Sequence, residues 1–174
     1  MSKKENILQA ALELFAKEGF HPTSTSKVAK KAGVSEGLIF RHFKNKTGLL
    51  EAILKEGEEK AKLLFSDIIF ESNPQKIIEK TIDLGRKFMA SKEISDFWKL
   101  QYKIKWEVEQ YNETKMEPLE LALINAFKKL GYESPKKEAR FLLIHLDGLA
   151  TRYFLQKDFN TEEAVQYLHK KYKH

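Results

Sequence analysis

The stretch of residues 24–46 constrains this chain most, because its local signals specify two short helices joined by a tight turn. Ser24 is suited to cap the first helix, since its hydroxyl can accept from a backbone N–H that would otherwise lack a partner. Gly33 suits the turn, where a residue free to adopt positive φ ends a helix. Ile39 and Phe43, four residues apart, form the inward face of the second helix. The spacing predicts a helix-turn-helix, although an ordinary corner between two helices would give the same pattern.

The distribution of charge favours the helix-turn-helix. Residues 1–46 contain nine Lys or Arg and four Asp or Glu, a net charge of +5. The remaining chain contains 22 and 21, a net charge of +1. Nearly all of the excess positive charge therefore lies in the first quarter of the chain, as expected for a surface that meets nucleic-acid phosphates.

This part of the chain resembles the TetR family of bacterial transcription regulators. The motifs that carry the resemblance are Ile7–Phe15, Lys17–Phe20, Ala32–Gly37 with the sequence Ala-Gly-Val-Ser-Glu-Gly, Phe43–Lys46 with the sequence Phe-Lys-Asn-Lys, and Leu49-Leu50. They cover roughly the first 54 residues, and beyond them the likeness is one of pattern only. The chain departs from the family at Phe40, where many members have Tyr, and at His42, where many have an aromatic residue, often Tyr. It also departs at Glu36, where many have a basic or neutral residue.

We expect two kinds of DNA contact in this stretch. Phosphates would be held by Ser24, Thr25, Lys27, Lys44 and Lys46. The face offered to the major groove would comprise Glu36, Gly37, Leu38, Phe40, Arg41 and His42, with Ser35 at the start of the helix. Glu36 would repel phosphate, so we expect it to stabilise its own helix at the positive end of the dipole or to accept from cytosine N4.

The pattern of the whole chain predicts an all-α protein of about nine helices. We expect a three-helix DNA-binding head at residues 1–46 and a helical effector-binding and dimerisation domain at residues 47–174. Ser2 and Glu5 form a capping box at the first helix. The boundary would lie near residue 47, inside a long helix from Lys46 to about Phe70. Asn73 would start a helix that continues to Met89.

The helix predicted from Pro135 to about Gln156 is apolar nearly all round, so it must be buried all round. A second copy of the chain would bury one side of it, with Gly148 allowing close approach; the alternative is a central core helix. The last helix would complete a four-helix interface, a pairing that the family resemblance also implies. The predicted interface residues are Leu142, Leu146, Gly148, Leu149, Tyr153, Val165 and Leu168.

The aromatic residues of the segment 91–112 have two interpretations. They fill a core at helical spacing, or they line an apolar pocket for an effector. The TetR resemblance implies that the effector is a small hydrophobic or amphipathic compound. The predicted pocket residues are Phe88, Met89, Phe97, Trp98, Tyr102, Trp106, Phe127 and His145.

No pattern predicts an enzyme, a metal site or a bound cofactor. Residues 33–37 match G-x-S-x-G, but an amphipathic helix precedes Ser35 where a hydrolase requires a strand, so Ser35 is interpreted as a helix cap. The chain has no Cys, its five His lack metal-ligand spacing, and no nucleotide-binding fingerprint is present. No signal peptide and no apolar run long enough to span a membrane is visible, so we expect a cytoplasmic protein.

Two functions from different classes remain. The first is a DNA-binding regulator, a repressor, that binds a palindromic operator as a homodimer and is released by a small hydrophobic effector. The second is a non-enzymatic helical binding module whose basic head binds RNA or another polyanion without ligand control. The helix-turn-helix spacing favours the first.

Overall fold

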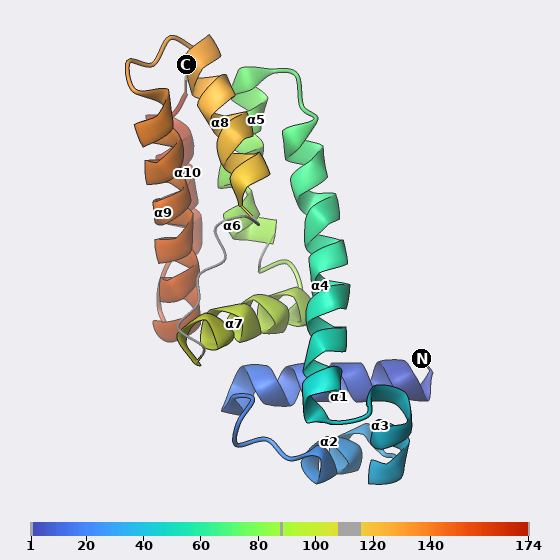
Figure 1. Cartoon of the computed structure of the whole chain (residues 1–174). Helices are drawn as coiled ribbons and strands as arrows, with labels where there is room; N and C mark the ends of the chain where they lie inside the picture. The colour runs from blue at the N-terminus through green and yellow to red at the C-terminus, as the bar shows by residue number, and fades with distance from the viewer. Residues whose placement is uncertain (1, 88, 108–115, 174) are drawn as a thin grey trace. The chain divides into compact units, whose positions relative to one another are not determined.

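The computed structural model describes residues 2–87, 89–107 and 116–173 (Figure 1). These residues contain ten helical segments and no strand, which confirms the predicted all-α fold. The chain divides into two compact units, residues 1–61 with 91–110 and residues 62–90 with 111–174. The division lies inside helix α4 (Lys46–Ile69). The predicted division near residue 47 concerns function and stays a prediction.

The first unit contains α1 (Lys3–Glu18), α2 (Thr25–Ala32), α3 (Glu36–Phe43), the first part of α4 (Lys46–Ile69) and α7 (Lys92–Glu107). The predicted capping box starts α1, because the Ser2 N–H donates to Glu5 at 2.7 Å and the Glu5 N–H donates to the Ser2 hydroxyl at 3.2 Å. The helix ends at Gly19, whose φ of 102° favours glycine.

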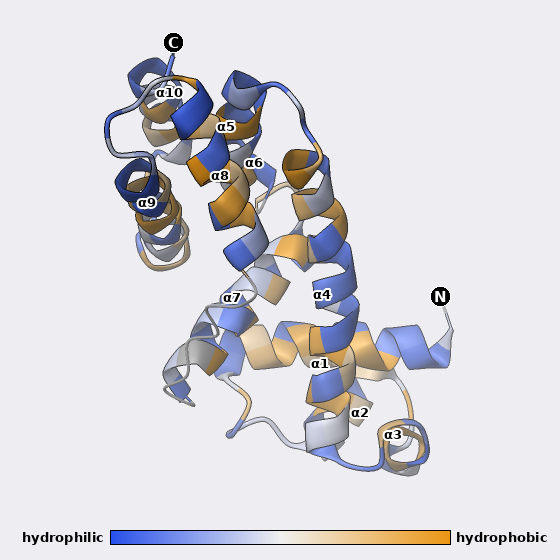
Figure 2. Cartoon of the chain, turned by 45° about the horizontal axis from the view of Figure 1, so that its top comes forward, coloured by the Kyte–Doolittle hydropathy of each residue, from blue (hydrophilic) through white to orange (hydrophobic). Residues whose placement is uncertain are grey.

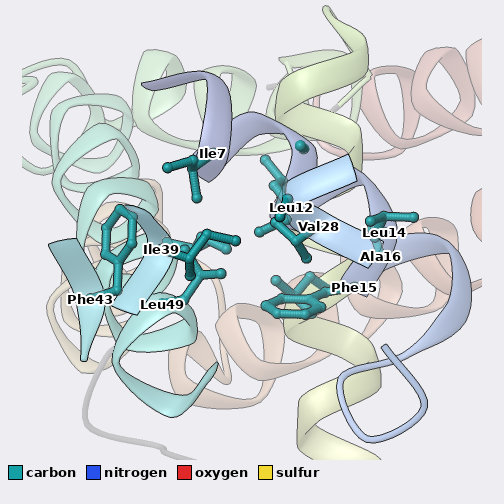
Figure 3. Packing of buried hydrophobic residues seen from close by; sticks show 14 of the residues in the cluster. Ile7, Leu12, Leu14, Phe15, Ala16, Val28, Ile39, Phe43 and Leu49 are labelled. Atoms are coloured by element: carbon teal, nitrogen blue, oxygen red, sulfur yellow. The ribbon is translucent and has the colours of Figure 1, made fainter. Parts of the chain in front are cut away.

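The core of the first unit joins α1, α2, α3 and α4 (Figure 3). Ile7, Phe15, Val28, Ile39 and Leu49 have no exposed surface. Burial of one such side chain stabilises a fold by about 1.5–3 kcal/mol. The apolar stripe of α1 therefore fixes the positions of the two short helices that follow it.

Helix α7 belongs to the first unit, where it packs on α1. The Lys103 ammonium donates to the Lys17 carbonyl at 2.9 Å, at the end of α1. Burial lowers the pKa of Lys103. The Phe97 ring lies so close to α4 that a β-carbon on Gly57 would come within 1.8 Å of it. Glycine at position 57 thus permits the contact between α4 and α7.

The second unit contains the end of α4 with α5 (Pro74–Ile82), α6 (Leu84–Lys87), α8 (Glu117–Lys129), α9 (Pro135–Leu155) and α10 (Thr161–Lys171). Asn73 caps α5 by accepting from the Lys76 N–H at 3.1 Å, and Asn160 caps α10 by accepting from the Glu163 N–H at 3.1 Å. The core includes Ile68, Ile78, Leu123, Phe127, Leu142, Val165 and Tyr172. The hydropathy of each residue in these helices can be followed in Figure 2.

The structure corrects the prediction of one helix running from Asn73 to Met89. The helix ends at Ile82 with Asp83 as its cap residue, and the four-residue α6 follows. Arg86 on α6 forms an ion pair with Asp83 and another with Glu162 on α10, with Nη2 and Oε1 2.6 Å apart. The interruption between α5 and α6 gives the described chain one more helical segment than expected. It is accompanied by an ion pair between residues that are far apart in the sequence.

Within the described residues, no helix combines the length and the apolar character needed to cross a membrane.

Candidate nucleic-acid interface

Helices α2 and α3 form the predicted helix-turn-helix within the first unit. The Ser24 hydroxyl accepts from the Lys27 N–H at 3.1 Å and caps α2. Gly33 has a left-handed backbone with φ of 66°, and the Val34 N–H bonds to the Ala29 carbonyl at 3.0 Å. These bonds close the end of α2 and turn the chain into α3.

Helix α3 is held by its inner face and presents its other residues outward. Ile39 and Phe43 are buried in the core of the unit, as predicted from their spacing. All twelve predicted DNA-binding residues lie in this unit and none of them is buried. Gly37, Phe40, Arg41 and His42 are exposed, and Phe40 keeps 45% of its surface accessible although it is aromatic. The exposed face of α3 is therefore available for contact with the base edges of a major groove.

Glu36 is bonded across the helix-turn-helix. The Thr25 hydroxyl donates to the Glu36 carboxylate at 2.5 Å and so ties the start of α2 to the start of α3. Ser35 occupies the cap position of α3, but its side chain makes no capping hydrogen bond, which corrects the prediction that its hydroxyl caps the helix. Glu36, in the first turn of α3, complements the positive end of the helix dipole.

The predicted phosphate ligands differ in how far their charges are already engaged. The Lys27 ammonium bonds to both carboxylate oxygens of Glu18, at 2.7 and 2.6 Å. The Lys46 ammonium donates to the Phe20 and His21 carbonyls at 2.9 and 3.0 Å and lies 4.5 Å from the centre of the Phe20 ring. Two of the three N–H groups of Lys46 thus bind carbonyls of the loop between α1 and α2, which leaves one N–H group for a phosphate.

Sequence reasoning missed two basic residues beside this interface. Lys3 of α1 and Lys30 of α2 line a concave surface together with Arg41 of α3, and its volume is about 570 Å³. Lys3 precedes the helix-turn-helix by more than twenty residues, and nothing in the sequence places it near α3. Only the net charge of the first quarter of the chain pointed to such a cluster.

The residues predicted to line an effector pocket fall into separate units. Phe97 is in the core of the first unit, Trp98 packs against that core, and Tyr102 is half-buried. Trp106, in the same unit, is 82% exposed. Phe127 is fully buried in the second unit.

Three predicted pocket residues remain. Met89 and His145 are half-buried in the second unit. Phe88 lies outside the described residues. An effector pocket stays a prediction.

The structure also revises the choice of dimer-interface residues. Leu142, Leu146, Val165 and Leu168 are buried within the single chain, so they offer no surface to a second copy. The predicted residues with accessible surface are Gly148, Leu149 and Tyr153. The periodicity of α9 was compatible with several faces, and packing against α8 decides which of them is internal.

No cluster of three His, Cys, Asp or Glu that could hold a metal ion occurs within the described ranges.

Comparison with known proteins finds sequence similarity in the N-terminal part of the chain. The profile described as "Bacterial regulatory proteins, tetR family" matches residues 7–53. A fatty acid metabolism regulator protein of Bacillus subtilis is 44% identical over 54 residues, which cover 31% of this chain and 28% of that protein. The HTH-type transcriptional repressor Rv3405c of Mycobacterium tuberculosis is 39% identical over 85 residues, which cover 48% and 43%. The chain thus aligns with less than half of the length of these curated relatives.

Solved structures resemble nearly the whole chain. The fatty acid degradation regulator FadR of Bacillus halodurans has a TM-score of 0.68 at 18% identity, over 99% of this chain and 95% of that one. A protein of Saccharomonospora viridis, described as a transcriptional regulator in complex with choline, has a TM-score of 0.76 at 18% identity, over 98% and 95%. Residues 7–53 thus match the profile of the TetR family, and the chain as a whole shares its all-α fold with these solved structures.

Proposed function

We propose that the protein is a DNA-binding transcription regulator that reads the major groove with α3. The observation that carries this proposal is the geometry of α3, whose inner residues Ile39 and Phe43 anchor it while its outer face is exposed. The family profile covers this same region. A rigid helix with one accessible face and a basic surrounding is what reading of base edges requires.

The regulator acts on a palindromic operator as a repressor. One α3 helix is only eight residues long, so a single head contacts too few base pairs for specific binding. Two heads related by a two-fold axis read two half-sites, and this symmetry makes the operator palindromic. The name of the Mycobacterium tuberculosis relative, a transcriptional repressor, supports repression rather than activation.

Homodimerisation uses the exposed side of α9. Phe141, Ile144 and Leu155 keep 50, 65 and 80% of their surfaces accessible in the single chain. They lie at helical spacing on one side of α9, and a β-carbon added at Gly148 would meet no atom within 4 Å. Exposed apolar residues that share one helix face favour burial against a partner, and an isologous contact would bury two such faces at once.

Light scattering tests this interface with a matched pair of variants. Ile144→Glu places a charge on the proposed interface and is expected to give monomers. Leu121→Glu changes a leucine that is similarly exposed, at 53%, on α8 and is expected to leave the dimer intact. If both variants remain dimers, the interface lies elsewhere on the chain. If both are monomers like the wild type, the protein does not form this dimer.

Release by a small hydrophobic or amphipathic effector completes the proposed function. The names of two similar proteins support this class of compound: one regulates fatty acid degradation and the other was solved with choline. Titration of such compounds into the protein–DNA complex is expected to identify one that lowers the affinity for DNA. An affinity unchanged by every compound tested would favour a regulator without this control.

A gel shift with the DNA that flanks the protein's own gene tests DNA binding, and competition with RNA of the same length tests the alternative. We expect retention of one DNA fragment in the presence of excess random DNA and RNA. Preferential binding of RNA would support the second function, a basic binding module. A reporter placed behind the bound fragment should rise when the gene is deleted, and a fall would indicate activation.

A further inference from the structure

A concave, positively charged surface lies at the side of the helix-turn-helix. Lys3 comes from the first turn of α1, Lys30 from the last turn of α2, and Leu38 and Arg41 from α3, while the turn at Gly33 forms part of the wall. Its volume is about 570 Å³, and none of the residues that line it is acidic. Three positive charges from three helices therefore surround one concavity.

These charges are not neutralised within the part of the chain that the structure describes. Lys3, Lys30 and Arg41 make no ion pair there. Lys31, the neighbour of Lys30 on the same helix, pairs with Glu13 at 3.0 Å. The contrast shows that acidic partners are available to α2 but are absent from the concavity.

The arrangement costs stability unless an anion is present. Like charges around one site repel one another, and a lysine in the first turn of a helix opposes the helix dipole by about 0.3–1 kcal/mol. Lys3 is such a lysine. Lys30 also has a local explanation, because it is in the last turn of α2, where the dipole favours a cation. Arg41 has the same local explanation, because it is in the last turn of α3, so among the three only Lys3 has none.

The geometry favours a phosphodiester of DNA over a small free anion. Arg41 lies on α3 between residues that face outward for base reading, so a DNA strand that flanks α3 passes beside it. Guanidinium and ammonium groups are the usual ligands of backbone phosphate. The lining contains no aromatic ring and no carboxylate that would recognise the base or sugar of a nucleotide.

We propose that Lys3, Lys30 and Arg41 together bind one backbone phosphate of the DNA, beside the base pairs that α3 reads. The site presupposes the DNA-binding function proposed above. It extends the interface beyond the helix-turn-helix to the first turn of α1, and it makes Lys3 and Lys30 determinants of affinity rather than of sequence preference.

Two pairs of neighbouring lysines give matched variants for a test. Lys30→Ala and Lys3→Ala remove charges from the concavity, whereas Lys31→Ala and Lys4→Ala remove the same charge from the adjacent positions. The affinity of each variant is measured by fluorescence anisotropy between 50 and 200 mM salt, on a duplex that the wild type selected from random DNA. Alanine favours helices, so circular dichroism should show unchanged helix content in all four.

The expected result is a smaller salt slope for Lys30→Ala and Lys3→Ala only. Loss of the whole phosphate contact would lower the slope by about 0.9, which makes the ratio of wild-type to variant affinity about 3.5-fold greater at 50 than at 200 mM for each half-site. Each single variant should show a smaller change in the same direction, because Arg41 and the other lysine remain. Duplexes with single neutral methylphosphonates should reveal a position that weakens the wild type more than the Lys3→Ala/Lys30→Ala variant, which keeps only Arg41 on that phosphate.

The outcomes separate the two proposals. A wild type that selects no duplex refutes the proposed function. A wild type that selects a duplex, with equal slopes for Lys30→Ala and Lys31→Ala, refutes the phosphate site alone. Absence of any methylphosphonate position that distinguishes the double variant from the wild type also refutes the site.

Discussion

Replacement of Glu36 by Gln tests whether this carboxylate organises the helix-turn-helix or reads DNA. In the structure the carboxylate accepts from the Thr25 hydroxyl at 2.5 Å and lies in the first turn of α3. Both contacts exist without DNA. They favour a structural role, in which Glu36 fixes the start of the reading helix relative to α2, over direct contact with cytosine.

The size of the effect follows from these two contacts. A neutral hydrogen bond contributes about 0.5–1.5 kcal/mol net, and a charge-assisted bond is roughly twice as strong. Gln retains the acceptor oxygen but loses the charge, and with it about 0.3–1 kcal/mol of interaction with the helix dipole. Because Glu36 is half-exposed, we take the lower part of these ranges and expect the free energy of unfolding to fall by about 1 kcal/mol. The corresponding fall in Tm is about 2–4 °C.

Urea unfolding of Glu36→Gln, Thr25→Val and the double variant measures the coupling between the two side chains. If the Thr25 hydroxyl is the partner of Glu36, Glu36→Gln lowers the free energy of unfolding less in the Thr25→Val background than in the wild type. Selection of binding sites from random DNA should give the same preference with Glu36→Gln as with the wild type. A half-site position that loses its cytosine in the Gln variant, at a cost of about 1–3 kcal/mol, would refute the structural interpretation.

Three further substitutions test contacts elsewhere. Lys46→Ala is expected to lower the free energy of unfolding by about 1–2 kcal/mol, because two loop carbonyls lose their donor, and an unchanged urea midpoint would contradict this. Gly57→Ala is expected to cost about 1–3 kcal/mol in the same assay, because the new methyl group meets the Phe97 ring, and the loss should shrink when Phe97 is also shortened to Leu. The Asn73 backbone N–H is the largest cause that lowers the pKa of Glu71 from 4.5 to about 2. Since a lowered pKa contributes stability that is present above pH 4.5 and lost as the pH falls toward 2, Glu71→Gln should flatten the acid limb of the unfolding curve there, and an unchanged limb would exclude this contact.

The parts of the fold that the sequence predicted depend on short-range signals. Ser24, Gly33 and the pair Ile39 and Phe43 act within one or two helical turns, and each has the predicted role. The cap at Asn160 belongs to the same class. Such signals are legible because the groups that interact are separated by a few residues.

The features that the sequence did not reveal depend on contacts between distant segments. Thr25 and Glu36 are eleven residues apart, and their hydrogen bond, which favours a structural role for Glu36, could not be predicted from the sequence. The burial of Leu142 and the exposure of Ile144 depend on which side of α9 packs inside the chain, and an apolar pattern on nearly all sides does not specify this. The end of α5 at Ile82 is likewise not specified, because the nearby Gly85 lies inside the next helical segment and not directly after the cap residue Asp83.

The net charge of the first quarter of the chain does not equal its capacity to bind phosphate. Exposed ion pairs such as Lys27 with Glu18 contribute only about 0–1 kcal/mol, so a DNA phosphate can compete for that lysine at small cost. Lys46 would have to leave two backbone carbonyls, which makes its transfer to a phosphate more costly. Lys3 and Lys30 have no such contact to give up in the described structure. Basic residues of equal formal charge therefore differ in the energy needed to recruit them, and Lys3 and Lys30 are less committed than Lys27 and Lys46.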